Sequence, residues 1–378
     1  MKVIILGAGL IGAPMAIDLA KENEFDVGVA DINRASLDKL QSHNIKLIET
    51  DLSIPETVRK VISDYDYVIN AVPGSLGFKT LRSIIEAGKN VVDIAFYEND
   101  PFELDELAKE KNVTAIVDCG VSPGLHNILI GNAAQRLDSI EDITIYVGGL
   151  PQVKEPPFEY KAVFSPSDVI EEYIRPARIK ENGKIVTKPP LSDLEIINFP
   201  GVGELEAFNS DGLRTLLHTI DVPNMKEKTL RFPGHVEKIS LLKDIGLFDK
   251  EELAINGNNI KPIDIAITLL KDEWKLKEGD KDFTLLQIII NGKKNDKRFK
   301  YTYDLLDHYD DSTQTISMAR TTGYTATSTL RMLASGLYKE VGISPLEFIG
   351  KNAECTGFIL GELRKRNVLI KESIHEKF

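Results

Sequence analysis

The chain has 378 residues, which is long for one domain and sufficient for two. Its composition, 42% hydrophobic and 28% charged, is that of a folded globular protein and excludes a disordered chain. The formal net charge of −12 argues against nucleic acid and anionic membranes as partners, and no apolar run is long enough to predict a transmembrane helix. The two cysteines, Cys119 and Cys355, predict no disulfide framework and no metal site, and they fit a reducing, cytoplasmic location.

The first 118 residues alternate strands with helices. Apolar runs predict strands at residues 2–6, 27–30, 45–48, 67–71, 90–93 and 113–117. Amphipathic patterns predict helices at residues 11–20, 55–63, 76–87 and 101–111. This alternation predicts an α/β fold with a Rossmann-type doubly wound parallel sheet, whose ligands lie beyond the carboxyl ends of the strands.

The pattern changes after Leu137. Strand-like runs occupy residues 143–147, 162–164, 184–187, 194–199, 228–232 and 284–291, with helical patterns at 212–219, 239–247 and 263–270. They predict an inserted α+β domain with a mostly antiparallel sheet. Helical patterns at 325–337, 345–351 and 355–366 are expected to return to the first domain. We therefore expect a dinucleotide-binding Rossmann domain at residues 1–125, a substrate and dimerisation domain at 126–318, and C-terminal helices at 319–378 that complete the first domain.

A glycine-rich turn follows the first predicted strand. Gly7 allows a tight turn, Gly9 lets the backbone approach a pyrophosphate, and Gly12 lets the helix pack closely on the strand. Leu10 completes the turn and Ile11 begins the helix, whose free N–H groups and partial positive charge face the phosphates. This order of strand, glycine turn, helix and second strand predicts a site for a nicotinamide dinucleotide. The alternative is a glycine turn that binds no ligand.

Asp31 ends the second predicted strand. A carboxylate there accepts hydrogen bonds from the ribose 2′-hydroxyl and repels a 2′-phosphate, so NAD is expected over NADP. Arg34 instead favours NADP, because its charge can pair with a 2′-phosphate. Further cofactor contacts are expected where later strands end, at Asp51, Asn70, Ala71, Val72, Pro73 and Asp93.

Polar residues after the fifth and sixth predicted strands are candidates for proton transfer. Asp93 and Tyr97 follow the fifth strand, where Asp93 either orients an amine or caps the next loop. Asp118 opens the loop after the sixth strand, and Gly120 and Pro123 shape its turn beside the expected nicotinamide position. The alternative for this loop is a helix start with no catalytic member.

The second domain offers three further candidates. Arg231 presents a planar fork that suits the carboxylate of an amino-acid substrate. His235 is a proton acceptor near neutral pH, although a lone histidine in a loop is more often a packing residue. Asn209 lies in a polar stretch interpreted as a turn before a helix, where it either contacts substrate or caps that helix.

Six short stretches, spread in order over both domains, carry a resemblance to one known family. They are residues 3–9 (VIILGAG), 118–124 (DCGVSPG), 147–151 (VGGLP), 203–208 (GELEAF), 229–235 (TLRFPGH) and 318–323 (MARTTG). With them the chain resembles the saccharopine dehydrogenase-like family over nearly its whole length. The stretches at 203–208 and 229–235 favour the branch of that family that oxidises L-lysine.

The resemblance implies a Rossmann domain completed by C-terminal helices, an inserted substrate domain and NAD-linked oxidation of a C–N bond. In the lysine-oxidising branch the ε-amino group of L-lysine is removed as ammonia, leaving allysine, which cyclises to piperideine-6-carboxylate. A protonated amine has no lone pair with which to expel hydride, so the ε-ammonium must first lose a proton to a base. The candidates for that base are Asp93, Tyr97, Asp118, His126 and His235.

Three other functions stay open. A saccharopine dehydrogenase, NAD(P)-dependent, joins or splits an amino acid and a carbonyl compound, and it would need further basic residues such as Arg175, Arg178, Arg214 and Arg320. A carboxynorspermidine dehydrogenase would act on a polyamine precursor. A nucleotide-sensing protein would keep the Rossmann fold without activity. The expected partners are a small amino-acid substrate and, from an exposed sheet edge, a second copy in a homo-oligomer, most simply a dimer.

Overall fold

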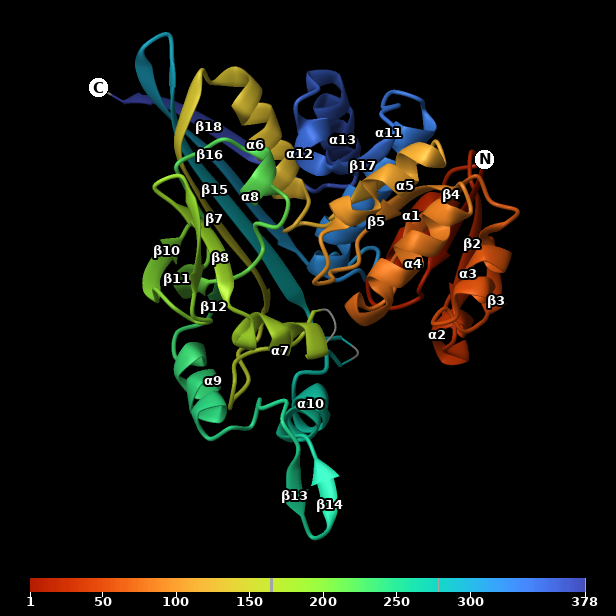
Figure 1. Ribbon diagram of the computed structural model, residues 1–378, viewed down its shortest axis with the longest axis horizontal. Helices are drawn as coiled ribbons and strands as arrows, with labels where there is room; N and C mark the ends of the chain where they lie inside the picture. Colours follow the sequence, from red (N-terminus) through yellow and green to blue (C-terminus); the bar gives the residue numbers. More distant parts are fainter. Residues whose placement is uncertain (164–165, 278, 378) are drawn as a thin grey trace. The chain divides into compact units, whose positions relative to one another are not determined.

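The computed structural model describes residues 1–163, 166–277 and 279–377, and the chain divides into two compact units (Figure 1). The first comprises Met1–Asp138, His218–Ile220 and Met318–Ile370, and the second comprises Ser139–Leu217, Asp221–Ser317 and the residues from Lys371 on. Two boundaries differ from the expected ones. Residues 126–138 stay with the first unit because their helix packs on two later helices, and residues 371–377 join the second because they pair with one of its strands.

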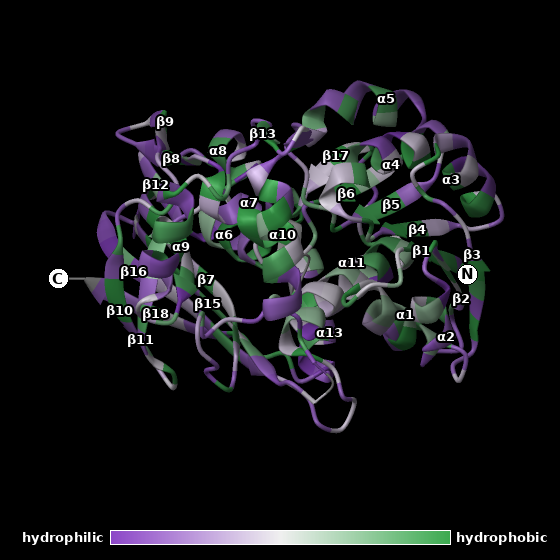
Figure 2. Ribbon diagram, turned by 90° about the horizontal axis from the view of Figure 1, so that it is seen from below, coloured by the Kyte–Doolittle hydropathy of each residue, from purple (hydrophilic) through white to green (hydrophobic). Residues whose placement is uncertain are grey.

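Within the described residues, the sheet of the first unit has the strand order β17–β6–β5–β4–β1–β2–β3, and every pair is parallel. Its strands are β1 (Lys2–Leu6), β2 (Asp26–Asp31), β3 (Ile45–Glu49), β4 (Tyr67–Asn70), β5 (Asn90–Asp93), β6 (Thr114–Val117) and β17 (Gly342–Pro345). The inner strands are continuous apolar runs because both faces are buried, and the apolar centres of β4 and β5 are green in Figure 2. The α/β fold with a parallel sheet is confirmed, whereas the edge strand β17 was not predicted.

Two groups of helices pack on this sheet. The first group is η1 (Pro101–Leu104), α3 (Pro55–Ile62), α4 (Gly74–Glu86) and α5 (Asp105–Glu110), and the second is α1 (Gly12–Ala20), α11 (Tyr324–Ala334) and α13 (Ala353–Lys365). The unit also contains α2 (Arg34–Asp38), α6 (Leu125–Arg136), α12 (Leu346–Gly350) and a π-helical turn, η2 (Ala319–Gly323). The first group shares a buried core with Ile4 and Leu6, while Ile5 points to the side of α1, where its Cγ2 lies against Gly12. The alternation of strand residues thus assigns the two groups to opposite faces.

A buried ion network joins α1 to the C-terminal helices. Asp18 accepts hydrogen bonds from Arg331 Nη1 at 2.9 Å and from Arg366 Nε at 2.8 Å. Glu22, one turn later, pairs with Arg331 Nη2 at 2.9 Å. Because Asp18 is buried, its charge needs these partners, and loss of both arginines would leave it uncompensated, at a cost of about 3–5 kcal/mol. The network therefore fixes the C-terminal segment on the helix that follows the glycine turn.

The second unit is built on a mixed sheet. Its main path is β10–β11–β12–β7–β15–β16–β18, with β8 beside β12 and β9 beside β8; only β12 and β7 pair in parallel among the described strands. The bounds are β7 (Ser139–Pro151), β8 (Ala177–Glu181), β9 (Lys184–Lys188), β10 (Glu195–Phe199), β11 (Gly203–Asn209), β12 (Asn224–Arg231), β15 (Asp282–Lys294), β16 (Lys297–His308) and β18 (Lys371–Lys377). The remaining elements are α7 (Pro166–Ile174), α8 (Leu216–Thr219), α9 (His235–Asp244), α10 (Pro262–Glu273) and the hairpin β13 (Leu253–Ile255) and β14 (Asn258–Ile260). The mostly antiparallel sheet is as predicted.

Several local predictions in this unit were wrong. The polar stretch at 204–212 was expected to be a turn, but its first six residues belong to the strand β11, because the charged Glu206 finds backbone partners inside the protein. The strands β8, β16 and β18 were not predicted at all. Ala162, in the expected strand at 162–164, makes only an isolated bridge, and residue 164 lies outside the described residues. In the part of the chain that the structure describes, no helix combines the length and the apolar character that a membrane crossing needs.

Candidate active site

The glycine turn after β1 leaves space where a dinucleotide is expected. Gly7 has φ +112°, and a Cβ on it would lie 2.5 Å from the carbonyl oxygen of Ala71. A Cβ on Gly12 would lie 2.1 Å from the carbonyl oxygen of Gly7. A Cβ on Gly9 would meet nothing within 4 Å. Gly7 and Gly12 are thus required by the fold itself, whereas Gly9 borders open space, which fits the approach of a pyrophosphate.

The start of α1 also suits a phosphate group. Its N-cap residue is Ile11, and no side chain caps the helix. Leu10 is exposed and lies between Gly9 and that N-terminus. The N–H groups of the first turn and the helix dipole therefore favour an anion at this end. The observed geometry fits a dinucleotide at the predicted residues.

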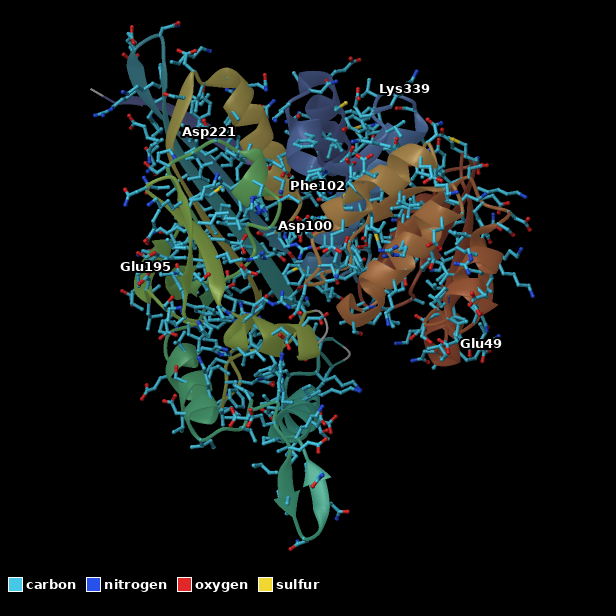
Figure 3. The ribbon with its side chains drawn as sticks, viewed as in Figure 1. Glu49, Asp100, Phe102, Glu195, Asp221 and Lys339 are labelled. Atoms are coloured by element: carbon cyan, nitrogen blue, oxygen red, sulfur yellow. The ribbon has the colours of Figure 1, made fainter. Side chains whose placement is uncertain are left out.

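Asp31 connects the end of β2 to the glycine turn. Its carboxylate accepts hydrogen bonds from the backbone N–H groups of Ala8 at 2.6 Å and Asn33 at 2.7 Å. Arg34 pairs with Asp38 at 2.8 Å and lies 3.7 Å from Glu49, which is labelled in Figure 3. The only positive charge suggested for a 2′-phosphate is therefore already paired with two acids.

The other predicted cofactor residues lie at neighbouring strand ends. Asp51 follows β3, where hydrogen bonds from Ser53 lower its pKa and keep it charged. Ala71, Val72 and Pro73 follow β4, and the Ala71 carbonyl faces Gly7. The side chain of Val72 is buried in the core beneath α4. This segment therefore borders the glycine turn with its backbone and not with its side chains.

Asn70, Asp93 and Tyr97 form one buried cluster at the ends of β4 and β5. Asp93 Oδ1 accepts from Asn70 Nδ2 at 3.0 Å and from the N–H of Ala95 at 2.9 Å, and Asp93 Oδ2 accepts from the Tyr97 hydroxyl at 3.1 Å. Burial raises the pKa of Asp93 to about 8, and the nearby charge of Asp118 acts in the same direction. The carboxyl group can therefore take up or release a proton near neutral pH.

The loop after β6 is tightly shaped around two glycines. A Cβ on Gly124, at φ +140°, would lie 2.0 Å from the carbonyl oxygen of Gly120. The N–H of Gly120 donates to the Pro123 carbonyl at 3.0 Å, and Asp118 adopts φ +55°. Cys119 N–H donates to the Asp93 carbonyl at 2.9 Å. The loop thus holds the predicted residues Asp118, Gly120 and Pro123 next to the Asp93 cluster.

Burial makes two other members of this loop poor participants in chemistry. Cys119 is fully buried, and burial raises the pKa of its thiol to about 12, so it carries no thiolate at neutral pH. His126 is also fully buried, and burial lowers its pKa to about 3, so the imidazole stays neutral and takes up no second proton near pH 7. This leaves Asp118 as the candidate base of this loop.

A buried carboxylate that the sequence did not reveal anchors this loop. Asn127 Oδ1 accepts from the N–H of Gly124 at 2.8 Å, and Asn127 Nδ2 donates to Glu347 Oε2 at 2.8 Å. The other oxygen of Glu347 accepts from the Thr219 hydroxyl at 2.5 Å. Glu347 is 220 residues from Asn127 in the sequence, so no local pattern could have shown the pair.

Arg231 and His235 form a second buried cluster, in the second unit. Arg231 Nη2 donates to Glu172 at 2.7 Å, Nη1 to the carbonyl of Leu230 at 2.9 Å, and Nε to the Tyr173 hydroxyl at 3.1 Å. Its guanidinium also lies 4.5 Å from the ring centroid of Tyr160. The side chain of Arg231 is only 3% exposed, so the predicted carboxylate fork is present but is held by a carboxylate of the protein itself.

His235 is fixed by the same cluster. Its Nδ1 lies 3.1 Å from the carbonyl oxygen of Phe158, which can only accept, so Nδ1 carries the proton. Nε2 then accepts from the Tyr173 hydroxyl at 3.0 Å. Burial and the charge of Arg231 lower the pKa of His235 to about 3. These contacts fit the interpretation of His235 as a packing residue. An imidazole with so low a pKa is a weak base and is not protonated at neutral pH.

Glu206 explains why two of the resembling stretches go together. It lies opposite Arg231 in the β11–β12 pairing, and its carboxylate accepts from the N–H groups of Gly234 at 2.6 Å and Val236 at 3.0 Å. It therefore caps the start of α9 from a neighbouring strand. Asn209 ends the same strand but points elsewhere, and its amide donates to Ser192 and Asp193.

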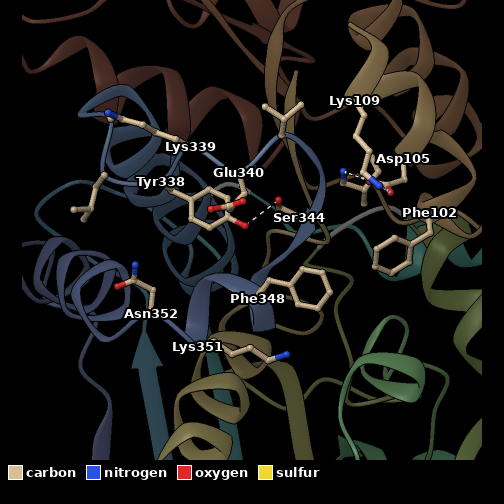
Figure 4. Close-up of a pocket in the computed structure, with 14 residues that line it drawn as sticks. Phe102, Asp105, Lys109, Tyr338, Lys339, Glu340, Ser344, Phe348, Lys351 and Asn352 are labelled. Atoms are coloured by element: carbon tan, nitrogen blue, oxygen red, sulfur yellow. Dashed lines mark hydrogen bonds and ion pairs between the residues drawn. The ribbon is translucent and has the colours of Figure 1, made fainter. Parts of the chain in front are cut away.

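A separate cavity of about 750 Å³ borders the edge strand β17 (Figure 4). Phe102 and Phe348 line it with their rings 6.2 Å apart, and Tyr338 donates to Ser344 at 3.0 Å. Its lining contains none of the predicted site residues. The predicted site residues therefore lie outside this cavity.

The geometry defines a two-unit protein with a dinucleotide-binding parallel sheet and a second unit on a mixed sheet. Residues 3–116 match the model of the saccharopine dehydrogenase NADP binding domain, and residues 120–369 match that of the saccharopine dehydrogenase C-terminal domain. The chain belongs to the saccharopine dehydrogenase family, as the resemblance predicted, and its first unit contains an NAD(P)-binding domain.

Curated relatives are distant. The mitochondrial alpha-aminoadipic semialdehyde synthase of Mus musculus is 25% identical over 66% of this chain, which spans only 29% of that protein. The NADP(+)-dependent, L-glutamate-forming saccharopine dehydrogenase of Schizosaccharomyces pombe is 24% identical over 66% of this chain and 58% of its own length. Carboxynorspermidine synthase of Vibrio cholerae is 22% identical over 92% of both chains. The apo L-Glu-forming saccharopine dehydrogenase of Saccharomyces cerevisiae shares the fold, with a TM-score of 0.82 at 19% identity over 99% of both chains.

Proposed function

We propose that this chain is a nicotinamide-dependent oxidoreductase that oxidises the C–N bond of an amine. The observation that carries the proposal is the buried Asp93, whose pKa of about 8 suits proton transfer and which accepts from Tyr97 at the end of β5. Family membership supports the reaction class, since relatives named saccharopine dehydrogenase and carboxynorspermidine synthase handle amines.

In this proposal Tyr97 and Asp93 together deprotonate the substrate ammonium. The ammonium gives a proton to the Tyr97 oxygen while the Tyr97 hydroxyl proton passes to Asp93 Oδ2, over the existing 3.1 Å contact. The freed lone pair then forms a C=N bond as hydride leaves the adjacent carbon. The bound cofactor supplies the hydride acceptor at its nicotinamide ring. Water adds to the resulting iminium, and the products are an aldehyde and ammonia.

We propose NAD as the cofactor and the ε-amine of L-lysine as the substrate. Asp31, and the pairing of Arg34 with two acids, support NAD, although the matched domain is described as NADP-binding. The stretches at 203–208 and 229–235 support lysine through the resemblance described above. In Asp31→Ser, preference should move toward NADP, and unchanged relative KM values for the two cofactors would remove Asp31 from that role.

Arg231 is the proposed anchor for the substrate carboxylate. Glu172 already places a carboxylate on its Nη2, which shows the chemistry that this position accepts. The side chain of Glu172 is 28% exposed, and we propose that a substrate carboxylate replaces it on Arg231. Asn209 stays a proposed substrate contact, and its side-chain nitrogen already donates to Ser192 and Asp193.

A second candidate substrate is a secondary amine of the saccharopine type. It is favoured by the similarity to the saccharopine dehydrogenase of Schizosaccharomyces pombe. The same proton transfer by Tyr97 and Asp93 serves either amine, so the two candidates differ only in the groups that hold the rest of the substrate.

The experiment that tests the proposal is NADH formation by the purified chain with NAD and L-lysine, without glutamate or 2-oxoglutarate. Formation of NADH with an equal amount of ammonia supports lysine deamination. NADH formation with saccharopine alone, releasing glutamate, would move the substrate to the second candidate. Cofactor binding without turnover on either amine would contradict the proposed activity and favour a nucleotide-sensing role.

A further inference from the structure

The π-helical turn η2 has no role in the proposed mechanism, although its sequence is one of the resembling stretches. A π-turn is wider than an α-helical turn, and such turns are frequent at functional sites. Here threonine hydroxyls satisfy its backbone: Thr321 Oγ1 donates to the Met318 carbonyl at 3.4 Å, and Thr325 Oγ1 donates to the Thr321 carbonyl at 2.7 Å. The threonine-rich sequence therefore builds the irregular turn by itself.

The π-helical turn η2 lies between α1 and the loop after β6. A Cβ on Gly323 would lie 3.0 Å from Met15 Cγ and 3.6 Å from the Ile11 carbonyl oxygen. A Cβ on Gly120 would lie 3.3 Å from Thr322 Cγ2 and 3.9 Å from Thr322 Oγ1. All of these residues belong to the first unit. The turn therefore extends from the start of α1 to the Gly120 loop.

Sheet order shows which half of a dinucleotide would lie beside this turn. β2, with Asp31, is on one side of β1, and β4, β5 and β6 follow on the other side. If the ribose of the adenosine half lies at Asp31 and the pyrophosphate at Gly9, the nicotinamide half extends toward the loops after β4, β5 and β6. Thr322, against Gly120 in the loop after β6, belongs to that half.

Thr322 differs from the rest of the turn in its surroundings. Ala319, Arg320, Thr321 and Gly323 are buried, whereas Thr322 is partly exposed. Its hydroxyl donates to the thioether sulfur of Met318 at 3.3 Å. A thioether is a weak acceptor, so a carbonyl oxygen of a ligand would be a better partner for this donor. The threonine methyl meanwhile stays in contact with Gly120.

We propose that the Thr322 hydroxyl turns from Met318 to the carboxamide oxygen of a bound nicotinamide and so fixes the orientation of the ring. Thr322 is then a positioning residue for the hydride acceptor and takes no part in proton transfer. The proposal rests on the proposed dinucleotide cofactor. It requires only rotation of one side chain in a turn whose backbone is already set.

The test is a pair of binding measurements on the full chain, by titration calorimetry with NADH and with ADP-ribose, which lacks the nicotinamide ring. Thr322→Val keeps the shape and the methyl contact with Gly120 but removes the hydroxyl. It should raise the Kd for NADH about five- to tenfold, the worth of one neutral hydrogen bond, and leave the Kd for ADP-ribose unchanged. Thr322→Ser, which keeps the hydroxyl, should bind NADH within about twofold of the unmodified chain.

Two results would overturn the role of Thr322: an unchanged Kd for NADH in Thr322→Val, or an equal rise for both ligands. Thr325→Val is the matched control, because Thr325 is buried and only supports the backbone of the turn. It should lower the melting temperature and affect both ligands alike. An unmodified chain that binds neither NADH nor ADP-ribose would instead contradict the proposed cofactor, which separates the two failures.

Discussion

The glycine turn of the first unit and the arginine cluster of the second unit are both rigid, yet they use their rigidity in opposite ways. The glycine turn packs its backbone tightly at Gly7 and Gly12 and leaves the space above Gly9 empty of protein. The cluster fills the fork of Arg231 with Glu172 and covers its face with Tyr160. A binding motif is therefore easier to identify from sequence when it constrains the backbone at several positions. A single side chain is a weaker signal, because another residue of the protein can be its partner in place of a ligand.

The largest expected effect concerns the proton-transfer pair of the first unit. Asp93→Asn keeps the hydrogen-bonded shape but cannot take a proton, so kcat/KM should fall about 10²- to 10⁴-fold. In the unmodified chain, kcat/KM should rise about tenfold per pH unit below pH 8 and level off above it, since Asp93 must lose its proton to act as the acceptor. Steady-state rates from pH 6 to 10 give this profile.

Tyr97→Phe is the partner variant, because it removes the hydroxyl that Asp93 accepts from. It should reduce kcat by a similar factor while NADH binding stays the same. If Asp93→Asn retains the rate and the pH profile of the unmodified chain, Asp93 is not the proton acceptor.

The second prediction compares two glycines of the same turn. Gly9→Val places a side chain in open space, so the fold should be preserved while the Kd for NADH rises about 10- to 100-fold. Gly12→Ala forces a Cβ against the Gly7 carbonyl, so it should lower the free energy of unfolding by about 1–3 kcal/mol. Urea denaturation and NADH titration of both variants measure the two effects. A Gly9→Val variant with unchanged NADH affinity would mean that the open space is not the cofactor's.

The third prediction asks whether the arginine fork is filled permanently or only until a substrate arrives. Arg231→Lys keeps the charge but loses the fork, and it should raise the KM for lysine about tenfold or more while the Kd for NADH stays unchanged. Glu172→Gln weakens the internal competitor, so it should lower the KM for lysine. A rise in KM in both variants would show that the pair is structural and that the carboxylate is bound elsewhere.

Features that depend on residues close together in the sequence could be predicted, and features that depend on distant residues could not. The parallel strands were clear because burial on both faces makes them apolar runs, as in β4 and β5. β17 was missed because its four residues include a glycine and a proline. β16 was missed because its exposed face alternates polar residues along Lys297–His308.

The site followed the same rule. Gly7, Gly9, Gly12 and Asp31 could be predicted because a strand, a turn and a helix close in sequence define their positions. Glu172, Glu206 and Glu347 could not, because each finds its partner on an element distant in the sequence. Long-range pairing of buried charges is therefore what sequence reasoning lacked here.

The last prediction concerns His235, and it measures how completely the second cluster is closed. A histidine with a pKa of about 3 in the folded state and about 6.5 in the unfolded state stabilises the fold above pH 6.5, and this stabilisation is lost as pH falls toward 3. Between pH 7.5 and pH 5 the loss is about 2 kcal/mol for this residue. His235→Gln keeps an acceptor for Tyr173 without the titration, so its stability should fall less with pH than that of the unmodified chain. Urea denaturation at the two pH values measures the difference. An equal fall in both proteins would show that His235 takes up its proton without unfolding, and hence that the cluster opens to water more readily than Arg231 and its aromatic neighbours indicate.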